Sequence, residues 1–246
     1  MLFYEVFGNS SADHPFPLIF LHGFLGSHLD WMPIIKELQT SYCCIAIDLP
    51  SHGKSISSSD VFLSLETALL ALSTPPPMLI GYSLGGRLAF SYGKKHPEKI
   101  KGLISISAHT GLTNALEKEK RMNADLLWQT RLETFSSEDF LTLWYQQPVF
   151  ASLQKRPELL ERLLKPRSYQ HPKELAAILA QASLAKQPLY DAFAHPIYFL
   201  FGEEDLAYAR LYGLKPTHLV KKIEQAGHAL HIENPLACIE AIRLFS

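Results

Sequence analysis

Short apolar runs recur along the chain and alternate with segments of helical spacing. The runs predict strands at residues 2–7, 18–21, 43–47, 78–81, 101–107, 197–201 and 218–222. Between them, apolar residues repeat every three or four positions at 31–38, 60–72 and 84–92, which predicts helices. This alternation predicts an α/β fold, with a mostly parallel sheet and helices on both of its faces.

The alternation stops between about residues 109 and 190. This segment has helical stretches with Trp128 and Trp144, is interrupted by prolines, and contains no convincing strand pattern. Because the strand pattern resumes at 197–201, we interpret the segment as a helical lid inserted over the sheet. The sequence has no repeat, low-complexity stretch or linker, so we expect a single domain over residues 1–246.

Composition and charge narrow the classes of partner. With 23 basic and 24 acidic residues the net charge is 23 − 24 = −1, which offers no general attraction to nucleic acid or to an anionic membrane. The apolar runs are far shorter than the roughly 20 residues that span a bilayer, and the N-terminus does not resemble a signal peptide. We therefore expect a cytoplasmic protein that binds neither nucleic acid nor membrane. The sequence leaves the oligomeric state open.

The cysteines and histidines do not predict a metal site. Cys43 and Cys44 are neighbours in an apolar run, Cys238 lies near the C-terminus, and none has metal-ligand spacing. We expect buried thiols in a reducing compartment. The histidines lack carboxylates or cysteines at a spacing that would complete a metal site, so we expect no metal.

A candidate nucleophile lies at the turn between the strand at 78–81 and the helix after it. Residues 81–85 match the pattern Gly-x-Ser-x-Gly, with Ser83 at the turn. Small residues on both sides of such a serine let the strand and the helix approach closely while the hydroxyl is held outward. The alternative is that Ser83 only caps the helix. The apolar run before it and the helical spacing after it favour a nucleophile elbow.

A carboxylate and a histidine follow later strands. Asp205 comes shortly after the strand at 197–201, and His228 follows the last predicted strand. The order Ser83, Asp205, His228 is the order in which α/β hydrolases place their triad. The histidine of such a triad accepts the serine proton, and the carboxylate fixes its tautomer. The alternative acids and the alternative base in the same loops are Glu203, Glu204 and His231.

Two backbone N–H groups and one arginine complete the candidate site. An oxyanion hole of this kind uses the residue after the nucleophile and a loop after an early strand, which here gives Leu84 and Phe24. Arg87 lies four residues after Ser83, on the same helix face and in a first turn that disfavours a cation. We interpret Arg87 as a clamp for a substrate carboxylate. The alternative is a side chain that extends into solvent.

Four short runs of residues in this sequence match the motifs of one known family. They are Leu-His-Gly-Phe at 21–24, Gly-Tyr-Ser-Leu-Gly-Gly-Arg at 81–87, Trp-Tyr-Gln-Gln-Pro-Val-Phe at 144–150, and Ala-Gly-His at 226–228 with Glu-Asn-Pro at 233–235. With these runs the chain resembles, over nearly its whole length, the MenH family of 2-succinyl-6-hydroxy-2,4-cyclohexadiene-1-carboxylate synthases of menaquinone biosynthesis. The third run is the most particular to that family. The resemblance implies the α/β-hydrolase fold.

The resemblance also implies a reaction and a set of site residues. It implies a cofactor-free lyase that expels pyruvate from 2-succinyl-5-enolpyruvyl-6-hydroxy-3-cyclohexene-1-carboxylate, a small anionic substrate. The substrate contacts that it implies, beside the triad, are Tyr82, Arg87, Arg121, Trp144 and Arg167. The lid is slightly longer after Phe150 than in the family, so Arg162 is an alternative to Arg167. A serine esterase or thioesterase, such as a carrier-protein methyl ester esterase, is the alternative reaction, and a non-catalytic binding module is a third possibility.

Overall fold

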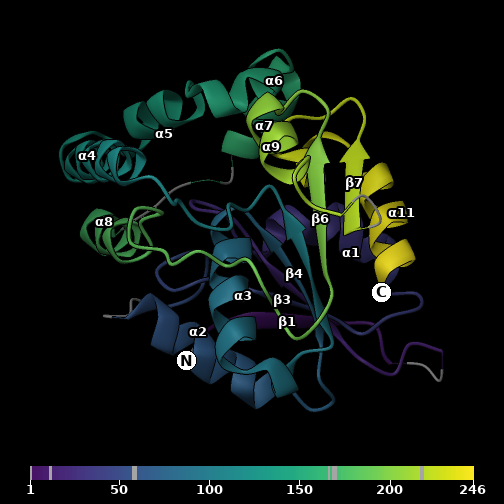
Figure 1. Cartoon of the computed structure of the whole chain (residues 1–246). Coiled ribbons are helices and arrows are strands. Elements are labelled where there is room, and N and C mark those ends of the chain that lie inside the picture. The colour runs from purple at the N-terminus through teal and green to yellow at the C-terminus, as the bar shows by residue number, and fades with distance from the viewer. Residues whose placement is uncertain (1, 11–12, 57–59, 166, 168–170, 217–218) are drawn as a thin grey trace.

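A twisted seven-stranded sheet forms the centre of the part of the chain that the structure describes (Figure 1). The structure is a computed structural model, and it describes residues 2–10, 13–56, 60–165, 167, 171–216 and 219–246. The strands are β1 Tyr4–Phe7, β2 Leu18–Leu21, β3 Cys44–Ile47, β4 Met78–Tyr82, β5 Gly102–Ile106, β6 Ile197–Gly202 and β7 Val220–Ile223. Their order is β1-β3-β2-β4-β5-β6-β7. Only β1 runs antiparallel to its neighbour among the strands described, so β2 to β7 end at one edge of the sheet.

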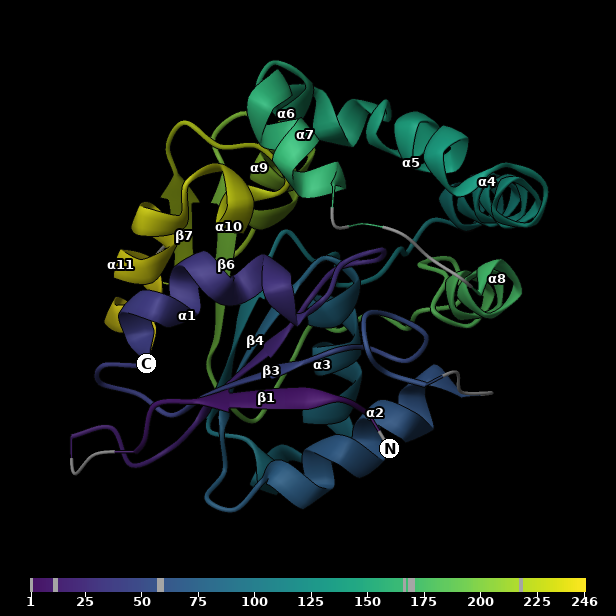
Figure 2. The same cartoon turned by 180° about the vertical axis from the view of Figure 1, so that it is seen from behind.

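Helices cover both faces of the sheet, and the strand residues divide between two apolar layers. The helices beside the sheet are α1 Met32–Leu38, α2 Val61–Leu72, α3 Leu84–Lys95, α9 Leu206–Tyr212, α10 Leu230–Glu233 and α11 Pro235–Phe245. Along β2, Ile19 and Leu21 pack in the cluster that includes α2 and α3, whereas Leu18 and Phe20 pack in the cluster that includes α1 and α11. Figure 1 shows α3 in front of the sheet, and Figure 2 shows α1 on the opposite side.

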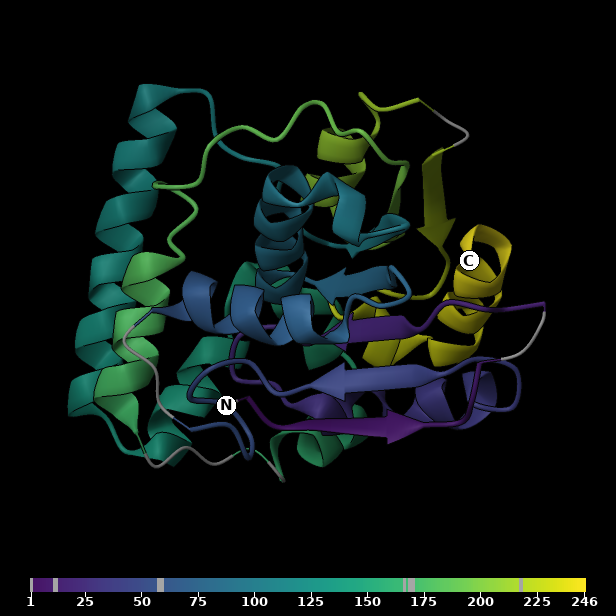
Figure 3. The same ribbon diagram turned by 90° about the horizontal axis from the view of Figure 1, so that it is seen from below.

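The helices between β5 and β6 form a separate layer over the ends of the strands, and we call them the lid (Figure 1). They are α4 Ala115–Thr134, α5 Ser137–Tyr145, α6 Ala151–Gln154, α7 Pro157–Leu164 and α8 Pro172–Gln181. Helix α8 lies alongside α4, as Figures 1 and 3 show. The lid has its own apolar core, and Leu25 from the loop after β2 inserts into it. The lid is thereby anchored close to the edge where the parallel strands end.

The predicted fold class is confirmed, with differences at its margins. The structure has the mostly parallel sheet with helices on both faces. The sequence pattern did not predict that β1 runs antiparallel, and β1 begins at Tyr4 rather than at Leu2. The last predicted strand began at residue 218, which lies outside the described residues, and β7 spans Val220–Ile223. The single-domain organisation stays a prediction. Within the described ranges, no helix combines the length and the apolar character needed to cross a membrane.

Candidate active site

Ser83 occupies a strained turn between β4 and α3. Its backbone angles are φ 46° and ψ −107°, a region that residues with a side chain rarely adopt. The Ser83 N–H donates to the carbonyl of Ile106 on the neighbouring strand at 2.9 Å, and the Ser83 carbonyl accepts from the Arg87 N–H at 3.0 Å. These two hydrogen bonds, one to the sheet and one within the first turn of α3, therefore keep Ser83 in its strained conformation.

Glycines allow β4 and α3 to cross at this turn. A Cβ atom on Gly81 would lie 2.5 Å from the Cα of Gly86, and one on Gly86 would lie 2.5 Å from the Cβ of Ala108. Both distances are far below van der Waals contact, so a larger residue at either position would push the helix away from the strand. Gly81 thus has the steric role that a nucleophile elbow requires of the small residue before the serine. Gly85, the predicted small residue after it, packs against β2, since a Cβ atom there would lie 2.3 Å from the Leu21 carbonyl oxygen.

Ser83, His228 and Asp205 form a hydrogen-bonded row. His228 Nε2 lies 3.4 Å from Ser83 Oγ, and His228 Nδ1 lies 2.8 Å from Asp205 Oδ2. The side chains of His228 and Asp205 are only 6% and 4% exposed, which protects the row from bulk water. Because a carboxylate only accepts, the proton of a neutral His228 belongs on Nδ1, and Nε2 is left to accept the hydroxyl proton of Ser83.

The alternative acids and base have other partners or surroundings. The exposed Glu203 pairs with Lys222 at 3.0 Å, and this hydrogen bond lowers the pKa of its carboxyl. Glu204 pairs with Lys155 and Arg156 in the lid. His231 is buried against Tyr82, with 4.2 Å between ring centroids, and burial lowers its pKa to about 3. Neither of its ring nitrogens has a hydrogen-bond partner among the described residues.

The loop after β2 brings Phe24 to Ser83. His22 supports this loop, since its Nε2 accepts from the Leu49 N–H at 2.9 Å and its Nδ1–H donates to the Gly23 carbonyl at 2.7 Å. Burial lowers the pKa of His22 to about 4, so the ring is neutral and fits this pair of contacts. Leu84 is the first residue of α3, where backbone N–H groups lack partners within the helix. Phe24 and Leu84 thus lie on the two segments expected to supply oxyanion donors.

A small cavity lies directly beside Ser83. Its volume is about 30 Å³. Four predicted site residues line it together with Ser83, and they are Phe24, Tyr82, Trp144 and Arg167. The lid closes one side of the cavity, because the Trp144 ring packs on the Phe24 ring with 5.1 Å between centroids. The structure therefore brings these side chains from the body and the lid into one place.

Arg167 is the arginine that lines this cavity. Its guanidinium donates to Asp30 at 2.8 Å and to the Leu25 carbonyl, and both charged side chains are at least nine-tenths buried. Burial acts to lower the pKa of Arg167, but the Asp30 carboxylate raises it above its ordinary value, so the cation persists. Arg162, the alternative, is exposed on α7 and does not line the cavity.

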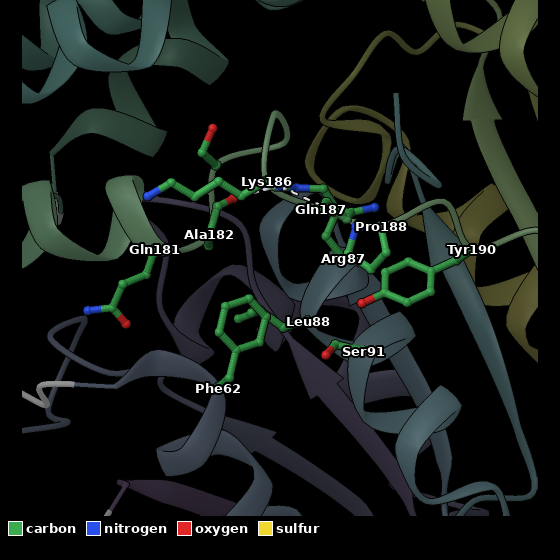
Figure 4. Close-up of a pocket in the computed structure, with 11 residues that line it drawn as sticks. Phe62, Arg87, Leu88, Ser91, Gln181, Ala182, Lys186, Gln187, Pro188 and Tyr190 are labelled. Atoms are coloured by element: carbon green, nitrogen blue, oxygen red, sulfur yellow. Dashed lines mark hydrogen bonds between the residues drawn. The ribbon is translucent and has the colours of Figure 1, made fainter. Parts of the chain in front are cut away.

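Arg87 and Arg121 do not line the cavity beside Ser83. Arg87 donates to the Ala182 carbonyl at 2.7 Å and borders a second pocket of about 340 Å³ (Figure 4). Arg121 donates to Asp125 on its own helix at 2.8 Å. Burial, assisted by the charge of Arg121, lowers the pKa of Arg87 to about 10, which leaves it charged at neutral pH. The structure thus separates these two arginines from Arg167, and their predicted contacts with substrate stay predictions.

Several residues of the site could not be predicted from local patterns in the sequence. Asp30 lines the cavity, and the Tyr208 ring lies 5.0 Å from the His228 ring. Asp30 is 137 residues from its partner Arg167, so no local pattern could join them. Glu233 accepts hydrogen bonds from the backbone on both sides of His228, and its only signal was its place in the Glu-Asn-Pro run. Among the described residues, no group of three or more His, Cys, Asp or Glu side chains is placed to hold a metal ion.

The fold and the site define an α/β hydrolase. The family model for the alpha/beta hydrolase fold matches residues 17–235. Two proteins named 2-succinyl-6-hydroxy-2,4-cyclohexadiene-1-carboxylate synthase, from Enterobacter sp. and Citrobacter koseri, are each 34% identical to this chain, over 94% and 92% of it and 92% and 91% of their own lengths. The chain belongs to the family of these synthases, and the resemblance noted in the sequence is confirmed.

Solved structures agree with this assignment. The structure of MenH from S. aureus superposes with a TM-score of 0.87 at 26% identity, covering 98% of this chain and 97% of that one. A thermophilic esterase from Thermogutta terrifontis superposes with a TM-score of 0.77 at 21% identity, covering 99% of this chain and 92% of that one. The second likeness shows the shared fold alone.

The buried histidines predict a loss of stability in mild acid. Burial lowers the pKa of His52 to about 3, whereas an unfolded histidine titrates near 6.5. Between these values the unfolded chain binds more protons, so the free energy of unfolding falls as the pH falls from about 6.5 towards 3. One such group contributes about 1.4 kcal/mol per pH unit. Urea unfolding from pH 7.5 to 5.5 should show a smaller slope in His52→Gln than in the wild type.

A matched control uses the exposed His171, whose replacement His171→Gln should leave the slope unchanged. Carboxylates titrate in both proteins and cancel in the comparison. Equal slopes for the wild type and His52→Gln would show that the folded protein protonates His52 as readily as the unfolded chain does.

Proposed function

We propose that the protein eliminates pyruvate from 2-succinyl-5-enolpyruvyl-6-hydroxy-3-cyclohexene-1-carboxylate and releases 2-succinyl-6-hydroxy-2,4-cyclohexadiene-1-carboxylate. The observation that carries the proposal is the hydrogen-bonded row of Ser83, His228 and Asp205 in a chain of the synthase family. In this proposal the three residues are a catalytic triad. No cofactor takes part in the steps described below.

The triad makes Ser83 a base. His228 Nε2 accepts the hydroxyl proton of Ser83, and Ser83 Oγ removes the proton from the ring carbon next to the succinyl carbonyl. The electron pair of that C–H bond moves first onto the succinyl carbonyl, which becomes an enolate. As the enolate collapses, a new ring double bond forms, the existing double bond shifts, and the C–O bond to the enolpyruvyl group breaks. The leaving enolpyruvate takes up the proton that His228 holds and becomes pyruvate. Asp205, 2.8 Å from His228, stabilises the imidazolium that forms in between.

The negative charge of the transition state falls on the succinyl carbonyl oxygen as the proton leaves. We assign its stabilisation to the backbone N–H groups of Phe24, which lines the cavity with Ser83, and of Leu84, the first residue of α3. The N-terminus of α3 adds its positive dipole end at the same place. Holding an enolate oxygen is electrostatically the same task as holding a tetrahedral oxyanion, so the same elbow serves elimination without a covalent intermediate.

The charges around the site suit an anionic substrate. Arg167 offers a cation within the cavity beside Ser83, and Arg87 and Arg121 are further candidates to pair with carboxylates. A cavity of about 30 Å³ is far smaller than the roughly 300–1,000 Å³ of typical ligand sites. Substrate binding therefore requires lid side chains such as Trp144 to move away from Phe24.

The cellular setting in this proposal is the cytoplasm, without nucleic acid or membrane as a partner. The thiols of Cys43, Cys44 and Cys238 are free, and two of them are buried. Unpaired cysteines are typical of a reducing compartment. The net charge of −1 supports a partner that is recognised by local arginines rather than by a broad charged surface.

A side-by-side assay tests the reaction against the esterase alternative. The purified protein is given the enolpyruvyl substrate and, separately, short acyl esters, while pyruvate release and ester hydrolysis are followed. We expect pyruvate release that is lost in Ser83→Ala and retained in Ser91→Ala, which removes a hydroxyl from the same helix but away from the cavity. Efficient ester cleavage without pyruvate release would overturn the proposal in favour of an esterase.

Replacement of the acid tests the role of Asp205. Asp205→Asn should lower turnover by about four orders of magnitude, because an amide allows the wrong tautomer of His228. The fold should persist, since Asp205 also accepts from the Tyr208 N–H at the start of α9 and asparagine caps helices equally well. Glu203→Gln, which alters an exposed carboxylate two residues away, is the control. Near-normal turnover in Asp205→Asn would move the role of the acid to another residue.

A further inference from the structure

One lid side chain contacts the two loops that carry the acid and the base. Arg156 lies immediately before α7, and its guanidinium donates to Glu204 Oε1 at 2.8 Å. The other end of the same guanidinium donates to the carboxylate of Glu233. It also donates to the Gln225 carbonyl at 3.0 Å. A single cation of the lid therefore joins the loop after β6 to the loop after β7.

Glu233 holds the backbone on both sides of His228. Its Oε2 accepts from the Gly227 N–H at 3.0 Å, and its Oε1 accepts from the Ala229 N–H at 3.2 Å. The side chain is only 1% exposed, and without Arg156 it would be a buried carboxylate lacking a cation. Such a loss is costly, because breaking one partner of a buried pair leaves an uncompensated charge. The position of the His228 loop therefore depends on the pair of Glu233 and Arg156.

Glu204 links the same network to the acid. It directly precedes Asp205, and its N–H donates to the Ala226 carbonyl, two residues before His228, at 2.9 Å. The two loops thus touch through their backbones, and Arg156 spans them a second time through the side chains of Glu204 and Glu233. This double link fixes the separation between the backbones that bear Asp205 and His228.

Helix α6 of the lid also packs directly against the loop that carries His228. A Cβ atom on Gly227 would collide with the side chain of Ser152 on α6, and the Ser152 hydroxyl donates to Glu233 at 2.5 Å. This close fit leaves no space for the loop to move towards α6 while the lid is seated. If α6 and the start of α7 moved away, the contacts of Glu233 with Arg156 and Ser152 would be lost together.

We propose that Arg156 is a positioning residue, which aligns His228 and Asp205 with Ser83 by joining Glu204 and Glu233. The distance from His228 Nε2 to Ser83 Oγ is 3.4 Å, at the long limit of a hydrogen bond, so a small displacement of the loop breaks the contact. A misplacement of about 1 Å costs roughly a hundredfold in rate. The inference rests on the proposed function only in that Asp205 and His228 are the acid and the base.

The neighbour Lys155 provides a matched control. It also carries a positive charge on the lid and pairs with Glu204 at 3.0 Å, but its side chain is 71% exposed and does not reach Glu233 among the contacts described. An exposed pair of this kind contributes little. A general effect of lid charge on an anionic substrate would appear in both variants, whereas an effect on the His228 loop would appear only when Arg156 is replaced.

The test measures how fast an alkyl fluorophosphonate labels Ser83, a rate that reports activation of the hydroxyl by His228 and needs no natural substrate. We expect Arg156→Ala to be labelled about ten- to a hundredfold more slowly than the wild type. Arg156→Lys, which keeps the charge but reaches one carboxylate at a time, should recover part of the rate, and Lys155→Ala should remain within twofold of the wild type. In pyruvate release, kcat should fall in parallel while KM changes less than threefold.

Circular dichroism and thermal melting establish whether each variant is folded. If Arg156→Ala loses its fold, Arg156→Lys and Glu233→Gln keep hydrogen-bonding groups of similar size, and slower labelling in both would support the proposal. Unchanged labelling of folded Arg156→Ala, or an equal loss in Lys155→Ala, would overturn the positioning role alone. Failure of the wild type itself to be labelled at Ser83 would instead overturn the assignment of Ser83 as the hydroxyl that His228 activates, and the role of Arg156 with it.

Discussion

The close crossing of β4 and α3 is the constraint on which the site depends. Ser83 at φ 46° is held there because Gly81 and Gly86 let the strand and the helix approach to a distance that no Cβ would permit. This crossing directs the hydroxyl to the edge where the parallel strands end. It also places the first N–H groups of α3 beside the hydroxyl, so the proposed base and one proposed oxyanion donor, the Leu84 N–H, depend on the same steric arrangement.

The rest of the fold places the residues that act with Ser83 close to it. Asp205 and His228 lie in loops after adjacent strands, β6 and β7, and the parallel arrangement of these strands makes the loops neighbours. The lid then adds constraints from residues far away in the sequence. Arg167 meets Asp30 within the cavity, while Arg156 meets Glu204 and Glu233 behind the triad. In the proposal made for Arg156, the seating of the lid and the positions of Asp205 and His228 therefore depend on each other.

The sequence predicted what local patterns encode. Short runs of residues were enough to predict the elbow, the strand ends and the order of Ser83, Asp205 and His228, because each lies at a recognisable boundary between a strand and a loop or helix. The direction of the Arg87 side chain could not be predicted. Helix spacing determines on which face of the helix the residue lies, but not that its guanidinium donates to the Ala182 carbonyl. The ion pairs of Arg167 with Asp30 and of Arg156 with Glu233 could not be predicted either, because 137 and 77 residues separate the two partners along the chain.

In the proposed reaction Ser83 acts as a base and forms no covalent bond with the substrate. Intact-protein mass spectrometry of samples quenched during steady turnover of the enolpyruvyl substrate would detect such a bond. We expect the protein to keep its unmodified mass throughout turnover, because Ser83 only relays a proton to His228. A mass increase located at Ser83, which appears and decays at the rate of turnover, would establish covalent catalysis instead.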